Sequence, residues 1–269
     1  MKTCFIVPKK YFYISQEHSD FYLLLAHQIQ RDDVDLFNGR PIVLDNGAYE
    51  LGQSVSEEKI FEVADWLHPD EIVLPDVRFE SHSTIWKVKD FLQRYYDERL
   101  KGKYRLLAPV QGSNWSDWKN CYQAFYTDYR IDCLGITDVP TDDRSLSCLV
   151  DKSPVALSRV EAALYLYRKD LFKKPVHVLG SIDPIELAYL SSFPNIEKTD
   201  SKIAFWNGVD GSCLSCQNGL FQGDFKREDM PYEFSKELSR GQIRDILWNI
   251  YVVKSLAKQS RIDVNHIRS

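Results

Sequence analysis

The sequence lacks the features that define several common classes of protein. Its 269 residues include only 12 Gly and 11 Pro, and 44% of them are hydrophobic, which excludes collagen-like, low-complexity and disordered chains. No segment approaches the roughly 20 apolar residues of a membrane-spanning helix. No internal repeat, linker or long run of one charge marks a domain boundary. We therefore expect one globular domain over residues 1–269, with no membrane partner.

The sequence also has no excess of positive charge and no need for disulfides. The formal charge is −5, so bulk charge does not support nucleic-acid binding, which would require a local site. The N-terminal apolar run is broken by Pro8, Lys9 and Lys10 and is too short for a signal peptide. The six cysteines are scattered through a chain large enough to fold without disulfides. We expect free thiols and a protein located in the cytoplasm of whatever cell makes it.

What the sequence does contain is an alternation of short β-rich runs and longer helical patterns. Several runs are apolar throughout, as expected for parallel strands buried on both faces. The runs that we predict as strands are Cys4–Val7, Pro41–Leu44, Glu71–Leu74, Tyr104–Val110, Ile131–Ile136, Pro154–Leu157, Pro175–Leu179 and Asn195–Thr199. About eight strands separated by helices fit either a closed (β/α)₈ barrel or an open doubly wound sheet.

Several helix starts are predicted from local signals. Ser54 with Glu57 and Ser158 with Glu161 match the capping-box pattern. Pro184 follows an aspartate and is predicted at the first position of a helix. Apolar residues at helical spacing predict a last helix near the C-terminus.

The residues after the strands decide between the two folds. A doubly wound dinucleotide binder should contain G-x-G-x-x-G after an early strand, and the sequence has none. Polar residues instead follow strand after strand, namely Asp45, Asp76, Gln111, Thr137, Asp138, Ser181 and Asp200. Barrel enzymes build their sites at the C-terminal ends of strands. We therefore predict a single-domain α/β protein, a (β/α)₈ TIM-type barrel with a C-terminal helical segment.

Five segments at these strand ends carry candidate chemistry. They are DNGAY at 45–49, PDV at 75–77, VQG at 110–112, LGI at 134–136 and LGS at 179–181. Asp76 could accept the ring N–H and the exocyclic amine of a guanine-type base, while Gln111 bonds a base carbonyl and Gly112 makes room for the ring. Each segment also has an ordinary structural explanation, such as a turn at Asp45 or a local ion pair of Asp76 with Arg78.

Taken together and in order, the five segments resemble the tRNA-guanine transglycosylase family. That family has a D-S-G-G-F-type segment, an Asp after the next strand, V-Q-G, G-L and M-G segments, and a nucleophilic Asp about twenty residues later. Here Asp200 lies 20 positions after Gly180, and the resemblance covers about residues 40–201. It implies a queuosine-related pentosyltransferase on a TIM-type barrel, and no cofactor is required for the chemistry.

The resemblance also implies residue roles. Asp200 would be the nucleophile that attacks C1′ of a nucleotide, and Asp45 would be the acid/base that transfers protons to and from the exchanged bases. The base pocket would be lined by Asp76, Gln111, Gly112, Gly135, Ile136 and Gly180. Exchange with retention needs one carboxylate to form a covalent glycosyl-enzyme and a second group to move a proton.

The zinc motif of the tRNA-modifying relatives, C-x-C-x-x-C followed by His, is incomplete here. Cys213 and Cys216 are present, but Gly211 stands where the first Cys is expected, and the next His is His266. A closed structural zinc site needs four ligands. Residues 202–269 are therefore predicted to be a divergent C-terminal part without a complete zinc site. The alternative is zinc completed by other ligands, such as Asp210.

The short chain and the incomplete zinc motif are more similar to the phage and bacterial DNA-guanine transglycosylases (DpdA-type). This resemblance implies replacement of guanine in DNA by a free 7-deazaguanine such as preQ0. The alternatives are the same exchange on tRNA, a barrel glycoside hydrolase with two carboxylates, and a non-catalytic binder of nucleobases or nucleic acid. A homodimer or an accessory protein is an open alternative for delivering the nucleic acid.

Three further features have two interpretations each. His177 lies inside a predicted strand, where packing is the expected role and a position beside the pocket is the alternative. Arg159, at a predicted helix start, is either a phosphate ligand or an ordinary surface residue. The scattered basic residues of the last helix and tail, such as Arg244 and Lys254, form either a solvated face or a contact for the nucleic-acid backbone.

Overall fold

The protein is a (β/α)₈ barrel, as predicted. The structure, a computed structural model, describes residues 1–139, 154–181, 184–214 and 232–259. Its eight strands are β1 (Lys2–Phe5), β2 (Tyr22–Leu25), β3 (Ile42–Asp45), β4 (Glu71–Val73), β5 (Arg105–Val110), β6 (Cys133–Ile136), β7 (Val176–Val178) and β8 (Ile196–Ser201). All paired neighbours are parallel, in the order β1-β8-β7-β6-β5-β4-β3-β2.

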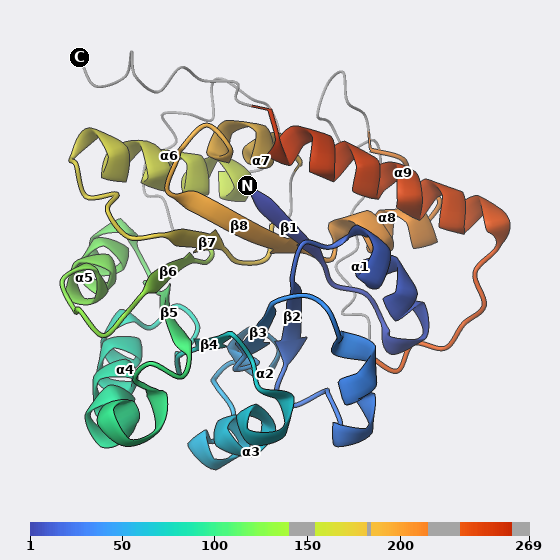
Figure 1. Ribbon diagram of the computed structural model, residues 1–269. Helices are drawn as coiled ribbons and strands as arrows, with labels where there is room; N and C mark the ends of the chain where they lie inside the picture. The colour runs from blue at the N-terminus through green and yellow to red at the C-terminus, as the bar shows by residue number, and fades with distance from the viewer. Residues whose placement is uncertain (140–153, 182–183, 215–231, 260–269) are drawn as a thin grey trace.

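Helices surround the strands in a nearly closed ring (Figure 1). The α-helices are α1 (Phe12–His18), α2 (Ala48–Leu51), α3 (Glu57–Leu67), α4 (Ser81–Tyr95), α5 (Trp115–Tyr126), α6 (Pro154–Arg168), α7 (Pro184–Leu190), α8 (Ile203–Val209) and α9 (Arg240–Ala257). Two short 3₁₀-helices, η1 (Lys9–Tyr11) and η2 (Arg31–Phe37), and a short π-helix, η3 (Tyr96–Leu100), lie in the connections. The predicted C-terminal helix is α9, which packs on α7 and α8. None of the helices in the described segments is both long and apolar enough to cross a membrane.

Side chains alternate between the inside and the outside of the barrel. In β6, Leu134 and Ile136 belong to the large core between the strands and the helices, whereas Cys133 belongs to the small core inside the barrel. Successive residues of a strand point to opposite faces. The inner cluster is apolar and includes Leu23, Val73 and Leu107, so the strands enclose a packed interior rather than a pore.

The ring is closed between β1 and β2 by loop residues instead of a strand ladder. Asp20 N–H donates to the Thr3 carbonyl at 2.8 Å, and the Asp20 carboxylate accepts the Thr3 N–H at 2.9 Å. The Ser19 hydroxyl accepts the Phe5 N–H at 2.9 Å. These bonds satisfy buried backbone groups of β1 that a ladder would otherwise pair.

Two strand predictions were wrong, one strand being predicted falsely and one being missed, so the number of predicted strands still equals the number observed. The predicted strand Pro154–Leu157 is the start of α6, and β2 was not predicted at all. A four-residue apolar run does not distinguish a buried strand from the first turn of a buried helix. Pro is also well tolerated in that first turn, where its missing N–H costs nothing.

Both predicted capping boxes were wrong, although the helices exist. The N-cap of α3 is Ser56, whose side chain accepts the Lys59 N–H at 3.3 Å, so the N-cap lies two residues after Ser54 and the helix begins at Glu57. Ser158 lies inside α6, which begins four residues earlier. Pro184 is the first residue of α7, as predicted, while the aspartate before it lies outside the described residues.

Candidate active site

A cavity opens at the C-terminal ends of the strands, and polar groups surround it above an apolar floor. Its volume is about 180 Å³, which is larger than the space that one or two waters fill. Leu23, Leu25 and Val73 from the barrel interior form the floor, and Ile6 and Leu179 contribute to the wall. The polar lining includes Asp45, Asp76, Gln111 and Asp200, from four different strands or strand ends. The cavity is thus the natural position for a barrel active site.

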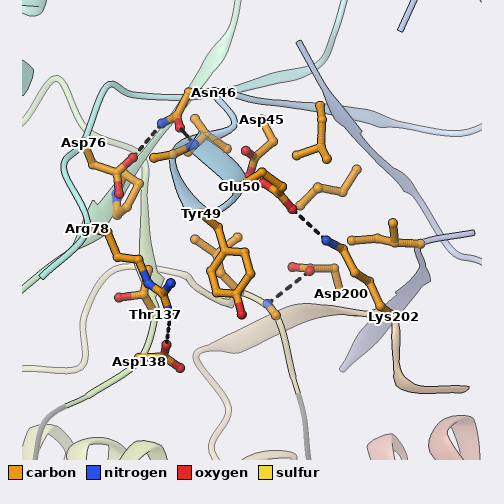
Figure 2. A pocket seen from close by; sticks show the side chains of 18 of the residues that line it. Asp45, Asn46, Tyr49, Glu50, Asp76, Arg78, Thr137, Asp138, Asp200 and Lys202 are labelled. Carbon is orange, nitrogen blue, oxygen red and sulfur yellow. Dashed lines mark hydrogen bonds and ion pairs between the residues drawn. The ribbon is translucent and has the colours of Figure 1, made fainter. Parts of the chain in front are cut away.

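Asp200 lies on β8 at the wall of this cavity (Figure 2). It is 3% exposed, and its Oδ2 accepts the N–H of Gly180 at 3.1 Å. The Ser181 N–H donates to the backbone carbonyl of Asp200 at 2.8 Å. One carboxylate oxygen is therefore fixed by the turn after β7, while the side chain still borders the cavity.

His177 lies behind Asp200 inside the barrel. It is fully buried, and its Nε2 is 2.9 Å from Asp200 Oδ1. That distance fits an ion pair, but the two atoms are not aligned as a hydrogen bond, since neither has a hydrogen-bond partner within the described structure. The ring meets Phe21 edge to face with centroids 5.5 Å apart. His177 thus contacts the candidate nucleophile without lining the cavity. No pattern in the amino-acid sequence indicates this contact.

Asp45 ends β3 and lies across the cavity from β8. Its Oδ1 accepts the N–H of Gly47 at 2.7 Å. Withdrawal from water, reinforced by the negative charge of Glu50, raises the pKa of Asp45 to about 8. Asp45 therefore carries a proton at neutral pH and can act as an acid.

The turn after Asp45 depends on a glycine. Gly47 has a φ of 75°, in the left-handed region, and a Cβ at this position would lie 2.4 Å from His27 Nδ1. Only Gly fits both the backbone angle and the close approach of the imidazole. The DNGAY segment therefore has its glycine for local packing reasons, and this packing presents Asp45 to the cavity.

Asp76, Asn46 and Gln111 form a buried polar cluster on one wall. The Asp76 carboxylate accepts Asn46 Nδ2 at 2.8 Å on one oxygen and Gln111 Nε2 at 2.7 Å on the other. Burial raises the pKa of Asp76 to about 6 despite these two bonds. The Gln111 amide is oriented because its Oε1 accepts the Phe79 N–H at 3.1 Å. Each Asp76 oxygen keeps a lone pair for a further donor, and Gln111 keeps one N–H.

The mouth of the cavity is built around Tyr49, which is 46% exposed. Figure 2 shows Tyr49 between Arg78 and Lys202, whose charged groups lie 4.4 and 5.7 Å from its ring centroid. Lys202 pairs with Glu50 at 2.6 Å, and Arg78 pairs with Asp138 at 3.3 Å. An aromatic ring flanked by cations is a surface on which a nucleobase and its phosphates could bind.

The structure brings most, but not all, of the predicted pocket residues together. Besides the four polar residues of the lining, Gly180 borders the cavity, but Gly112, Gly135 and Ile136 do not. A Cβ at Gly112 would lie 2.4 Å from Trp118 N, and one at Gly135 would lie 2.7 Å from Leu179 Cδ1. Both glycines therefore permit close packing, and Ile136 points outward because it follows Gly135 by one residue in the same strand.

Only one of the two predicted metal residues lies within the described structure. Cys213 is exposed, and Cys216 lies outside the described residues. Over the described ranges no three His, Cys, Asp or Glu side chains cluster as metal ligands. Four ligands are required for a closed structural zinc site. Within the described residues, no zinc ligand set is assigned.

Several residues of the site were not singled out as pocket residues in the sequence. Asn46 and Lys202 each lie within two residues of a predicted catalytic aspartate, so proximity to Asp45 and Asp200 was the available signal. Glu50 on α2 and Arg78 in the loop after β4 line the cavity, and no local pattern indicated this. Asp138 also lines the cavity and is one of the polar residues that follow a predicted strand.

The comparisons with known proteins add no assignment. The sequence matches no protein-family model and no curated protein. The chemistry of the protein is therefore inferred from the geometry of the cavity and from the residues that line it.

Proposed function

We propose that the protein is a pentosyltransferase that exchanges guanine in DNA for a free 7-deazaguanine base through a covalent glycosyl-enzyme. The observation that carries the proposal is the environment of the two aspartates on the cavity. Asp45 is protonated at neutral pH, whereas Asp200 is oriented by a backbone N–H and lies beside a buried imidazole. One acid and one nucleophile facing a single cavity are what base exchange requires.

In the first half of the proposed reaction, a carboxylate oxygen of Asp200 attacks C1′ of the target nucleotide. The C1′–N9 bond breaks as the new C1′–O bond forms, and its electron pair leaves on N9 of guanine. Asp45 donates its proton to the departing base and becomes a carboxylate. The sugar is then held as an ester of Asp200, and the charge on the two aspartates has moved from one to the other.

In the second half the steps run in reverse with a different base. The Asp45 carboxylate takes the proton from N9 of the incoming 7-deazaguanine, whose N9 attacks C1′. The C1′–O bond breaks, and Asp200 leaves with its electron pair. The apolar floor under the cavity limits the access of water, which would otherwise hydrolyse the ester.

Asp76 and Gln111 supply the recognition that this exchange needs. The free lone pairs of Asp76 can accept the ring N–H and the exocyclic amine of a guanine-type base, and the remaining N–H of Gln111 can donate to its carbonyl oxygen. A target base in a duplex would first have to leave the stack. Tyr49, Arg78 and Lys202 at the mouth are suited to receive the neighbouring part of the strand.

The test is incorporation of radiolabelled guanine into duplex DNA, single-stranded DNA and unmodified tRNA at low salt. We expect label in DNA only, and label in tRNA only would move the substrate to tRNA. Hydrolysis of glycosides without guanine incorporation would favour the glycoside hydrolase. Binding of guanine that survives loss of Asp200, with no incorporation, would favour the binder.

Asp200→Asn is the decisive variant. We expect guanine incorporation to fall by at least roughly 10⁴-fold, because a nucleophile in a covalent mechanism has no substitute. The covalent adduct of protein and nucleic acid, seen as a band resistant to denaturation, should disappear with it. The matched control is Asp65→Asn on the exposed face of α3, which should keep full activity. An Asp200→Asn protein that still exchanges guanine would refute the nucleophile assignment.

A further inference from the structure

Arg159 and Glu186 form an ion pair behind the turn that holds Asp200. Both side chains are fully buried, which excludes the surface or phosphate-binding role considered for Arg159 from the sequence. The pair is bidentate, with Arg159 Nε 2.9 Å from Glu186 Oε2 and Nη2 2.7 Å from Oε1. Such a fork fixes the guanidinium plane as well as its position.

The third nitrogen of the guanidinium reaches the active-site turn. Arg159 Nη1 donates to the carbonyl oxygen of Leu179 at 2.8 Å and lies 3.3 Å from that of Gly180. The Leu179 carbonyl and the Gly180 N–H belong to one peptide unit, which is planar and trans. Its N–H points the opposite way and donates to Asp200 Oδ2 at 3.1 Å. One rigid group thus connects the buried cation to the candidate nucleophile.

The residues on either side of this peptide have backbone bonds of their own, since the Leu179 N–H donates to the Ile136 carbonyl at 2.9 Å and the Ser181 N–H donates to the Asp200 carbonyl at 2.8 Å. The Leu179 carbonyl itself is bonded by Arg159.

Gly180 is exposed, has a φ of 64°, and no atom lies within 4 Å of where its Cβ would be. Ser181 strengthens the arrangement, because its hydroxyl donates to Glu186 Oε1 at 2.8 Å. The ion pair is therefore tied to the turn on both sides of Gly180.

We propose that Arg159, held by Glu186, is a positioning residue that orients and polarises the Leu179–Gly180 peptide so that its N–H holds the Asp200 carboxylate for attack. The inference rests on the proposed function for the identity of the nucleophile. A cation on the carbonyl oxygen strengthens the N–H at the other end of the same peptide as a donor. The carboxylate is then presented in one orientation in each half of the exchange.

The nature of the pair argues against a role in stability alone. A buried ion pair is often replaced by apolar residues of similar volume without loss of stability, because desolvation offsets the attraction. The barrel offers a matched control in Lys198 and Glu71, a buried pair 2.7 Å apart on the inner face. We therefore compare Arg159→Met/Glu186→Leu with Lys198→Met/Glu71→Leu. Arg159→Lys keeps the charge but loses the fork.

The first measurement needs no catalytic activity. Amide hydrogen exchange of the peptide that contains Gly180 should be at least roughly tenfold faster in Arg159→Met/Glu186→Leu and in Arg159→Lys, since the segment loses its anchor. The Lys198→Met/Glu71→Leu control should leave it unchanged. Unchanged protection in both Arg159 variants would overturn the proposal, whether or not the wild-type protein exchanges guanine.

The second measurement separates positioning from binding. In a wild-type protein that exchanges guanine, kcat should fall by about 10²-fold in both Arg159 variants, because a small misplacement of a reacting group has an effect of this size. KM for the free base should stay within about twofold, since Asp76 and Gln111 are untouched. An equal loss of kcat in the control pair, or an unchanged kcat in Arg159→Lys, would overturn the positioning role. A wild-type protein without guanine exchange would refute the proposed function. The hydrogen-exchange result would then decide whether Arg159 positions the Leu179–Gly180 peptide.

Discussion

The two ends of the barrel treat buried charge in opposite ways. Near the N-terminal ends of the strands, Lys198 pairs with Glu71 at 2.7 Å, and Arg105 lies 3.5 Å from Glu71 and 2.9 Å from Glu197. Two cations thus face two anions. At the C-terminal ends, the described residues that line the cavity include five carboxylate side chains and two cations, Arg78 and Lys202.

The difference shows at which end of the barrel the fold tolerates carboxyl groups without a cationic partner. Charges that are paired with one another are expected at the face of a barrel that serves stability. At the other end, burial, reinforced by the negative charge of Glu50, raises the pKa of Asp45 to about 8, so that this carboxyl group keeps its proton at neutral pH. A carboxyl group that keeps its proton at neutral pH can donate it in a reaction.

Breaking the N-terminal pair should have the largest effect on stability. Lys198→Met leaves Glu71, which is 2% exposed, without its closest cation, and we expect the free energy of unfolding to fall by about 3–5 kcal/mol. Urea denaturation measures it. Lys198→Met/Glu71→Leu should recover most of the loss, and a single variant as stable as the wild type would show that the pair is not tightly coupled.

Asp45→Asn tests the acid at the C-terminal end. We expect guanine exchange to fall by about 10²-fold or more, since proton transfer contributes this much. The wild-type rate should decline above about pH 8, where Asp45 loses its proton, and the remaining activity of the variant should lack this decline. A pH–rate profile measures both. An unchanged alkaline limb in the variant would assign the acid to another group.

The same group makes stability depend on pH. The pKa of Asp45 is raised in the folded protein to about 8, while an aspartate in the unfolded chain titrates near about 3.9. Its contribution is fully present below about pH 4 and is lost as the pH rises through about 8. The Tm of the wild type should therefore fall more between pH 5 and pH 9 than the Tm of Asp45→Asn.

Asp76→Asn should have a smaller effect, confined to base binding. We expect guanine affinity to fall by about 10- to 100-fold, since the variant replaces a charged acceptor with an amide that offers one. Wild-type affinity should also weaken as the pH falls below about 6, where Asp76 takes up a proton. Calorimetric titration with guanine measures both effects. Equal affinity in wild type and variant would remove Asp76 from the base pocket.

Much of the architecture was predictable because it depends on local rules. Apolar runs at regular spacing indicated parallel strands, and polar residues after them indicated the functional end of a barrel. The failures were local as well. The predicted strand Pro154–Leu157 is the start of a helix, and the strand Tyr22–Leu25 was not predicted. A run of four apolar residues has too little periodicity to distinguish a strand from a helix.

The candidate site was predictable only in part. Asp45, Asp76, Gln111, Gly180 and Asp200 all border the cavity, because each follows or ends a strand. Gly112, Gly135 and Ile136 were expected there but serve packing or face the helices. A glycine that makes room for a ligand can be distinguished from one that makes room for a neighbouring helix or side chain only when the position of that neighbour is known.

The sequence by itself determined the fold class and the end of the barrel where chemistry is expected. The periodicity of apolar residues and the polar residues at strand ends are local patterns, so they can be recognised in the amino-acid sequence alone. Only the tertiary structure decided the partners: that His177 lies 2.9 Å from Asp200, and that Arg159 reaches the peptide that holds it. These contacts join residues on separate strands and helices, and their geometry arises from closing the barrel, which no local pattern encodes.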